Sequence, residues 1–431
     1  MQLKSPRSIT GQLSLATCGL LQAVAPTAHA ESEWQIDSAV MIYSESDGRV
    51  NALEPVVNAA REIGQDETIN LKLVLDALTG ATPNGANPSP NPQTFTSPSG
   101  SGAYTINANE DPLDDTFHDT RVSMSADWEQ PVFDEYSRMI LGGNISKEFD
   151  YMSLGASISL LRDFNQRNTT ASIALGVNSD TITPVGDIPI PLAHMQILEN
   201  DSNRNGGSDN KSITDVMFGL TQVIDRNTLM QFNLGFSSTS GYQNDPYKIV
   251  TIVDDVTGLP IADTATDRPY VYESRPDSRS RQTFFWKTVH HLTEDTINFS
   301  YRYYTDDWDV NSHTLDLHYR YELGGNSYLE PHVRYYTQTA AEFFTHGLTA
   351  TELASTQYAS ADYRLGEFNS TTLGLKYATP LGKTSEFSVR GEIITQAHND
   401  VAVPTGYEAT GLDLSPDLTA VVLQLGYSFK W

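Results

Sequence analysis

The densest set of side chains that could carry chemistry lies in two neighbouring segments, residues 309–322 and 326–338. Histidine, carboxylate and guanidinium groups alternate there with apolar residues, so the polar side chains of each segment share one face. If a turn joins the segments as antiparallel strands, they form four facing pairs: Glu322–Tyr328, Arg320–Glu330, His318–His332 and Asp316–Arg334. Two of these pairs carry opposite charges, and each would contribute a few tenths to about one kcal/mol.

This charged group allows three interpretations. It is either an ion-paired wall or a charged constriction that selects solutes inside a pore. The side chains that would line such a pore are Arg302, Asp316, His318, Arg320, Glu330, His332 and Arg334. A metal site on His318 and His332 is the third interpretation, but two histidines leave the carboxylate ligand unassigned.

A second group with ligand chemistry lies between residues 180 and 210. Oxygen-bearing side chains follow the calcium-loop spacing D-x-N-x-N-G, with an acid at the ninth position. They are Asp201, Asn203, Asn205 and Asp209. The twelfth position is Ser212, where a calcium loop has a bidentate glutamate, and the flanking segments are not helical. The segment is therefore either a calcium loop or a polar loop tip. Apart from Ca²⁺ in this external loop, if it is a calcium loop, we expect no cofactor.

The sequence carries no common enzyme motif. The nucleophile motif G-x-S-x-G, the zinc motif H-E-x-x-H and a phosphate loop are all missing from it. Ser312, His313 and His346 are isolated candidates for catalysis, and nothing in the sequence pairs them. We therefore expect that the protein is not an enzyme.

The elements that must position these groups are strands. Apolar and polar residues alternate in runs of about ten residues, which is typical of half-buried strands. The alternation predicts sixteen strands, an even number as in single-chain bacterial outer-membrane barrels. Their expected ranges are 34–44, 49–61, 67–77, 119–129, 136–147, 150–163, 168–179, 211–225, 227–238, 279–292, 294–306, 309–322, 326–338, 367–379, 384–397 and 416–431.

The connections between these strands fall into a short set and a long set. The long connections are 78–118, 180–210, 239–278, 339–366 and 398–415, and all would leave the same end of a barrel. Outer-membrane barrels have short periplasmic turns and long external loops. The sequence thus predicts an all-β transmembrane antiparallel barrel with long external loops. The low-complexity segment 79–104 would either enter the lumen as a constriction or plug, or stay mobile outside.

The first thirty residues have the features of an export signal. A basic start precedes an apolar stretch, and Ala28-His29-Ala30 has the small-x-small pattern of a cleavage site. We expect residues 1–30 to be a signal peptide and residues 31–431 to form one barrel domain. Cys18, the only cysteine, would leave with the signal, which excludes disulfides and cysteine catalysis.

The last strand and the composition indicate the location. Residues 416–431 alternate up to the terminal Trp431, which resembles the signal read by the outer-membrane barrel assembly machinery. The 54 acidic residues against 27 basic ones make a nucleic-acid partner unexpected, because phosphate binding needs Lys and Arg. No run after residue 30 is long and apolar enough for a membrane helix. We expect the outer membrane of a Gram-negative cell, with its lipid and lipopolysaccharide as partners.

Several segments resemble a known family. They are Leu71–Ala86, Glu199–Asn203, Ser240–Tyr242, Asp245–Lys248, Arg275–Arg279 and Ser360–Gly366. Together they resemble the proteobacterial domain-of-unknown-function family numbered 3570. The resemblance implies an exported outer-membrane barrel without an agreed activity. It also implies a neighbourhood of small lipoproteins, flavin-transfer proteins and thioredoxin-like proteins, and hence a link to an envelope redox system, without a role for any residue.

Two hypotheses for the function follow. The first is a porin-like channel for small polar solutes or ions. The second is a plugged barrel that serves as an anchor or as an export or assembly partner for an envelope redox or lipoprotein system. An open lumen would favour the channel, whereas ordered loops 78–118 and 239–278 in contact with another chain would favour the partner role.

Overall fold

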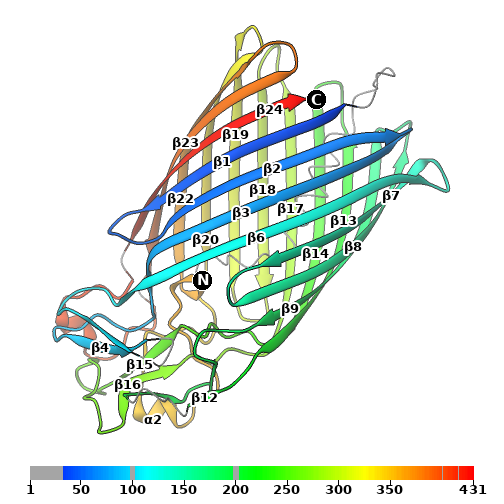
Figure 1. Ribbon diagram of the computed structural model, residues 1–431. Coiled ribbons are helices and arrows are strands. Elements are labelled where there is room, and N and C mark those ends of the chain that lie inside the picture. The colour runs from blue at the N-terminus through cyan, green and yellow to red at the C-terminus, as the bar shows by residue number, and fades with distance from the viewer. Residues whose placement is uncertain (1–32, 98–101, 198–202, 400, 416) are drawn as a thin grey trace.

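The protein is a closed β-barrel. The computed structural model describes residues 33–97, 102–197, 203–399, 401–415 and 417–431. Sixteen antiparallel strands form the wall, and the last strand pairs with the first (Figure 1). In order around the wall they are β1 (Trp34–Glu45), β2 (Asn51–Gly64), β3 (Glu67–Pro83), β6 (Leu113–Val132), β7 (Asp134–Lys147), β8 (Tyr151–Phe164), β9 (Thr169–Ile182), β13 (Asp209–Val223), β14 (Thr228–Gly241), β17 (Ser278–His291), β18 (Thr296–Asp306), β19 (Asn311–Gly324), β20 (Ser327–Gln338), β22 (Phe368–Pro380), β23 (Ser385–His398) and β24 (Leu418–Lys430). The sixteen predicted strands and the all-β fold class are confirmed.

The observed strand limits differ most from the expected ones in β3 and β6. These strands were expected over 67–77 and 119–129, but their pairing continues as far as Pro83 and Leu113. A membrane crossing needs about 9–11 residues of a tilted strand. The 17 residues of β3 therefore extend beyond the bilayer. Outside the lipid no face has to be apolar, so the alternation that identifies a strand is lost there.

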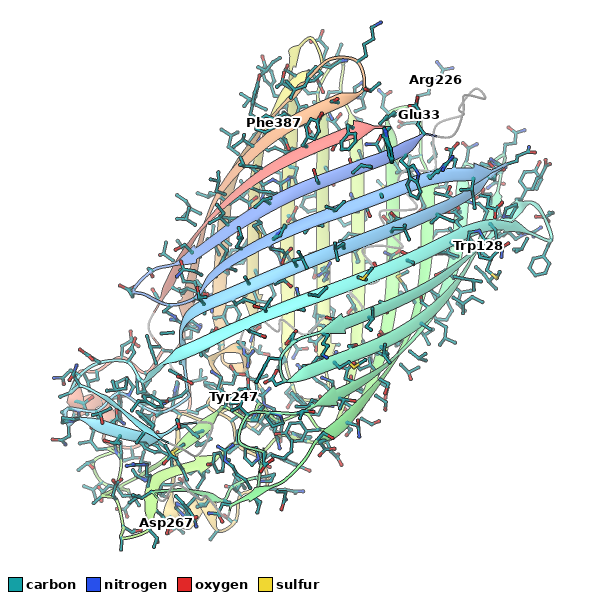
Figure 2. All side chains as sticks on the ribbon, viewed as in Figure 1. Glu33, Trp128, Arg226, Tyr247, Asp267 and Phe387 are labelled. Atoms are coloured by element: carbon teal, nitrogen blue, oxygen red, sulfur yellow. The ribbon has the colours of Figure 1, made fainter. Side chains whose placement is uncertain are left out.

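The outer surface of the wall is apolar. The large apolar side chains on strands β19, β20 and β22 are 41 to 58% exposed, and they include Leu315, Leu317, Val333, Leu373 and Leu375. Polar residues lie between them in the sequence, and side chains project from both faces of the wall (Figure 2). So much exposed apolar surface is unfavourable in water but favourable against lipid tails. Among the described residues, no helix has the length and apolar character of a membrane span.

The two ends of the barrel differ, as predicted. The turns at one end cover only residues 65–66, 133, 165–168, 224–227, 292–295, 325–326 and 381–384. At this same end Trp34 and Trp431 exchange two backbone hydrogen bonds of 2.6 and 2.9 Å. The long connections leave the opposite end, and they are residues 84–112, 183–208, 242–277, 339–367 and 399–417.

These five long connections form a folded layer, which we call the cap. Its elements are β4 (Gln93–Thr96), β5 (Ala103–Ile106), β10 (Ile188–Pro189), β11 (His194–Gln196), β12 (Arg204–Asn205), β15 (Ile249–Val253), β16 (Asp267–Tyr272), β21 (Gly347–Thr349), α2 (Ala350–Leu353), η1 (Tyr363–Leu365) and η2 (Tyr407–Thr410). They gather at one end of the barrel (Figure 1). A four-stranded sheet in the order β11-β16-β15-β21 takes its strands from three different connections.

The buried apolar clusters of the described residues lie in the cap and the adjoining strand ends. Strand β15 lies at the centre, where Val250 and Ile252 are 0 and 1% exposed. Phe95 is also fully buried, with its ring centroid 4.7 Å from that of Tyr270. The described part of segment 79–104 thus neither enters the lumen as a plug nor stays mobile outside, the two courses that the sequence left open. Its apolar residues pack instead into the core of the cap.

The cap extends across the external mouth of the barrel. Connection 46–50, between β1 and β2, and connection 242–277, between β14 and β17, start half the barrel apart in the strand order. Tyr363 comes from a third connection and contacts both. Its ring centroid is 5.4 Å from the guanidinium carbon of Arg49 and 5.7 Å from Nζ of Lys248. Contacts between opposite sides of the wall can form only over the opening.

Removal of Phe429, Lys430 and Trp431 is expected to prevent barrel closure. These residues pair β24 with β1 and β23, and Trp34 would lose both of its bonds to Trp431. An unclosed edge leaves unpaired backbone groups in lipid. The measurement is heat-modifiable migration in detergent gels.

The matched control is the double variant Phe429→Ala, Trp431→Ala, which keeps the backbone ladder and removes only the two rings. It should still close when refolded in detergent, and it should assemble poorly in cells if the aromatic residues are the assembly signal. Normal migration of the deletion variant would contradict the prediction.

Candidate functional site

The seven side chains predicted to line a pore lie on one face of strands β18, β19 and β20. The alternate residues of these strands are exposed and apolar, as shown by Leu317 and Val333, and they face lipid. The charged residues therefore face the lumen. His332 is buried, Arg334 is exposed, and the other five are half-buried.

The predicted register of β19 and β20 is confirmed, but the predicted ion pairs are not. Asp316 faces Arg334 and His318 faces His332, as expected. Arg320, however, donates from Nε to Oε1 of Glu322 at 2.5 Å, and its guanidinium lies 3.8 Å from the ring centroid of Tyr328. Asp316 and Arg334 do face each other as predicted, but Arg320 and Asp316 contact other neighbours on the same face, because residues two apart on one strand share a face and compete for the same partners.

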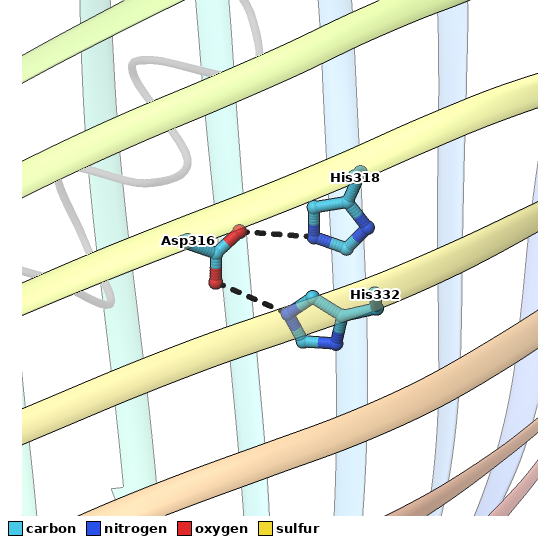
Figure 3. A group of neighbouring side chains, drawn as sticks. All are labelled: Asp316, His318 and His332. Carbon is cyan, nitrogen blue, oxygen red and sulfur yellow. Dashed lines mark hydrogen bonds and ion pairs between the residues drawn. The ribbon is translucent and has the colours of Figure 1, made fainter.

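Asp316 lies beside two imidazole rings and contacts one with each carboxylate oxygen (Figure 3). Its Oδ1 is 3.1 Å from Nε2 of His318, and its Oδ2 is 3.2 Å from Nε2 of His332. The two rings stack with their centroids 4.1 Å apart and 7° between their planes. Asp316 is thus the carboxylate that the two-histidine site lacked. The sequence signal for it is the spacing D-x-H on one strand opposite a histidine on the next.

Two further carboxylates contact the other nitrogen of each ring. Oε1 of Glu330 is 3.2 Å from Nδ1 of His318, and Oε1 of Glu392 is 2.9 Å from Nδ1 of His332. Arg390 lies 3.7 Å from both glutamates. Sequence reasoning missed Glu392 and Arg390, because they lie on β23, two strands away from β20.

Gly374 explains how Glu392 reaches His332 across strand β22. In the register, Gly374 lies between these two residues. A Cβ atom at position 374 would come within 2.9 Å of the Glu392 side chain. The absence of a side chain at position 374 therefore leaves room for the contact between Glu392 and His332. A glycine within the alternating pattern of β22 is the sequence feature that could have indicated such a contact across the strand.

The predicted calcium ligands lie in the connection before β13 and at the start of that strand. Asp201 lies outside the described residues. Asn203 donates its amide to the carbonyl of His194 at 2.7 Å, Asn205 pairs with Ile188 in the β10–β12 ladder, and Asp209 begins β13. Calcium binding stays a prediction. The isolated candidates for catalysis are apart, because Ser312 and His313 are adjacent on β19 and face opposite sides of the wall, and His346 lies in the cap.

A second charged group is buried inside the cap. Arg275 donates from Nη2 to Oε2 of Glu273 at 2.9 Å and to Oδ2 of Asp362 at 2.8 Å. Arg364 donates from Nη2 to Oδ2 of Asp245 at 2.9 Å and also binds Asp362. These bonds join connection 242–277 to connection 339–367.

The charges in this group oppose the cost of burial. Burial alone would raise the pKa of Asp362, but Arg364, Lys248 and Arg275 together outweigh burial and hold that pKa far below its usual range. Burial also opposes ionisation of Asp245, and the same three cations together make its pKa low. Burial lowers the pKa of Lys248 to about 8, and its Nζ donates to the carbonyl oxygen of Pro83. The two aspartates thus stay ionised inside the cap.

The segments that carry the family resemblance build this group. Asp245 and Lys248 belong to one such segment, Arg275 to a second, and Asp362 and Arg364 to a third. Pro83 belongs to the long segment Leu71–Ala86. Segments that are far apart in the sequence therefore meet in the cap.

A pocket lies beside this group, between the cap and the barrel mouth. Its lining includes Arg49, Asp111, His346, Tyr363, His398 and Ser415. His346 is 5% exposed, and its Nε2 lies 3.4 Å from Oγ of Ser415. Burial, with a smaller effect of His398, lowers the pKa of His346 to about 4.

The substitution Arg364→Met is expected to loosen the cap by about 3–5 kcal/mol, because it leaves the buried Asp245 carboxylate without its arginine and leaves Asp362 with Arg275 as its remaining arginine. The readout is hydrogen exchange in residues 242–277 and 339–367 of the folded barrel. The matched control is Arg162→Met, which breaks a pair whose side chains are 52 and 40% exposed and should cost no more than about 1 kcal/mol. Equal exchange in the two variants would contradict the prediction.

The stability of the cap is expected to fall as the pH drops from about 6.5 to about 4. The pKa of His346 is low in the folded cap, so the unfolded cap takes up a proton that the folded cap does not. The loss should reach about 3 kcal/mol at pH 4, at 1.36 kcal/mol per pKa unit. Hydrogen exchange corrected for intrinsic rates measures it, and His346→Gln should flatten this part of the profile. An identical profile in the two proteins would argue against it.

Comparison with known proteins gives a family and a set of barrel structures. The family model described as "Protein of unknown function (DUF3570)" matches residues 10–429. No curated protein matches the sequence. Among solved structures, OprD of Pseudomonas aeruginosa is 10% identical with a TM-score of 0.41, over 95% of this chain and 98% of that chain. The CymD monoaromatic hydrocarbon channel is 8% identical with a TM-score of 0.42, over 99% and 93% of the two chains. With nearly the whole sequence matched by the family model, the chain belongs to the DUF3570 family.

Proposed function

We propose that this protein is an outer-membrane channel for small polar solutes or ions whose external mouth is covered by the cap. The observation that carries the proposal is the charged inner wall. A sixteen-stranded barrel encloses an aqueous lumen unless other parts of the protein fill it. Arg334 on this wall is exposed, which supports a water-accessible lumen.

Both signs of charge lie on this wall, which suits a pathway for polar solutes. Arg302, Arg334 and Arg390 share the lumen face with Asp316, Glu330 and Glu392. Rings of charged side chains select solutes by sign and hydrogen bonding.

The cap would control access from outside. Its connections meet over the mouth and share an apolar core, so a solute of more than a few atoms needs the cap to shift. For the cap to shift, the bonds between connections 242–277 and 339–367 would have to break. A channel of this kind opens rarely when intact and more readily when the cap is weakened.

The second candidate function is a closed barrel that anchors a partner, such as an envelope lipoprotein or a redox protein. The observation that favours it is the ordered cap. The described parts of loops 78–118 and 239–278 are folded around a common core, as a partner role predicts. An anchor would stay closed whatever the state of the cap, which separates the two candidates.

Conductance in planar bilayers tests the proposal. Ser274 and Ala359 form an isolated antiparallel bridge with backbone bonds of 2.9 and 2.8 Å, so cysteines there would lie within disulfide range. The double variant Ser274→Cys, Ala359→Cys should conduct less when oxidised than when reduced, because the disulfide ties the cap together. Arg364→Met should open more often than the unmodified protein.

Two controls make the result specific. The single variant Ser274→Cys should not respond to reductant. Arg334→Glu reverses a lumen charge without touching the cap, so it should change ion selectivity and leave the opening frequency alone. Silence of both the unmodified protein and Arg364→Met, each shown to be folded by gel migration, would overturn the channel proposal in favour of the anchor.

A further inference from the structure

We propose that Asp316, His318 and His332 bind a divalent first-row transition-metal ion, of which Zn²⁺ is the representative, on the inner wall of the barrel. The proposal goes beyond the channel function and does not depend on it, because a site on the wall can bind an ion whether or not solutes pass. Residues 316 and 318 lie near the middle of β19, so the ion would sit near the middle of the bilayer and be reached through the lumen.

The three side chains supply two imidazoles and one carboxylate. Their ligand atoms all lie within 4.8 Å of one another. Zn–N and Zn–O bonds of about 2.0–2.2 Å in a tetrahedral site place neighbouring ligand atoms about 3.3 Å apart. The two distances from Asp316 oxygens to imidazole Nε2 atoms, 3.1 and 3.2 Å, are close to this value.

The contacts on the far side of each ring match those of metal-binding histidines. A ligand histidine usually gives its other ring N–H to a carboxylate, which fixes its orientation and leaves a lone pair for the metal. His318 has Glu330 at Nδ1, and His332 has Glu392 at Nδ1. Figure 3 shows both Nε2 contacts on the Asp316 side. An ion-paired wall does not require two histidines that share one carboxylate and each have a second carboxylate at the other ring nitrogen, whereas a metal site does use this arrangement.

The local charge also suits a divalent cation. The contacts around the two imidazoles link three carboxylates and one guanidinium. The carboxylates are those of Asp316, Glu330 and Glu392, and the guanidinium is that of Arg390. With neutral imidazoles the group has two excess negative charges, which one divalent ion would balance. Two more cations occupy facing positions in the register, Arg334 opposite Asp316 and Lys376 opposite Glu330. They limit the affinity and leave the site open to exchange.

The fourth coordination position would face the lumen. Three protein ligands leave a position for water or an arriving solute, as in open zinc sites. Two imidazoles and a carboxylate suit Zn²⁺, Fe²⁺, Co²⁺ and Ni²⁺, whereas Mg²⁺ and Ca²⁺ prefer oxygen ligands. The site should therefore discriminate transition metals from Mg²⁺ and Ca²⁺, which separates it from the predicted calcium loop.

The test is titration of the folded, untagged, metal-stripped protein with Zn²⁺ by calorimetry, and with Co²⁺ by its visible absorption. We expect one Zn²⁺ per chain, unaffected by an excess of Mg²⁺, and a Co²⁺ spectrum of low coordination number with nitrogen ligands. His318→Gln and His332→Gln should each weaken binding at least a hundredfold. Glu392→Gln, which removes only an outer contact, should weaken it about 10- to 100-fold.

The matched control is His313→Gln. His313 lies on the same strand as His318 but on the outward face, where its Nδ1 is 2.8 Å from the Tyr301 hydroxyl. This variant should bind like the unmodified protein. Each variant must first show heat-modifiable migration, and Asp316→Asn, which keeps the shape of the side chain, replaces any variant that fails to fold.

The outcomes are separable from those of the channel proposal. Absence of one-to-one binding, or equal binding by the unmodified protein and His332→Gln, would overturn the metal site. If the protein binds Zn²⁺ but never conducts, the metal-site proposal holds and the channel proposal is wrong. If both hold, Zn²⁺ should reduce the conductance of the unmodified protein and leave that of His332→Gln unchanged.

Discussion

In a bilayer no water is available to pair a backbone N–H or C=O group, so a chain that crosses as β-strands must close its sheet upon itself. In this protein closure is made by β24 against β1, and most other features follow from it. Once the sheet is closed, lipid surrounds its outer face, and alternate residues of each strand must be apolar. The remaining residues face the lumen. A charged residue in a membrane-spanning strand therefore faces the lumen, because a charged side chain in contact with lipid is energetically unfavourable. The clustering of charges on β19, β20 and β23 is a consequence of that restriction.

The same constraint decides how much of the structure could be predicted from the sequence. The alternation identified every strand of the barrel wall, and the turn between β19 and β20 fixed the facing of His318 and His332. The ion partners were not predicted, because alternation determines which face a side chain occupies but not which of several neighbours on that face it binds. Asp316 was assigned to Arg334 opposite, yet its carboxylate contacts two histidines. Glu392 was missed for a further reason: its contact with His332 passes over Gly374 and requires the register of three strands at once.

The cap was beyond sequence prediction for a different physical reason. Its elements are too short to carry a period, and its sheet combines strands from three connections. Val250 and Ile252 are buried in a cluster with Leu348, Ala359 and Ala361, which belong to a different connection. The segments shared with the family marked the important parts of these connections but not their arrangement. Only in three dimensions do Asp245, Arg275 and Asp362 become one ionic group.

The two charged groups differ in the chemistry of their cations, and this difference supports different roles for them. In the cap, carboxylates are paired with arginines, which keep their charge at any pH the protein meets, so the pairing is permanent. On the inner wall, the carboxylates of Asp316, Glu330 and Glu392 contact imidazoles, whose protons can be replaced by a metal ion. The wall carboxylates are also more exposed, at 24% for Asp316, 19% for Glu330 and 13% for Glu392, whereas those of the cap group are 1 to 8% exposed. A permanent, enclosed group fits the task of holding connections together, and an exchangeable group beside water fits the task of binding something that comes and goes.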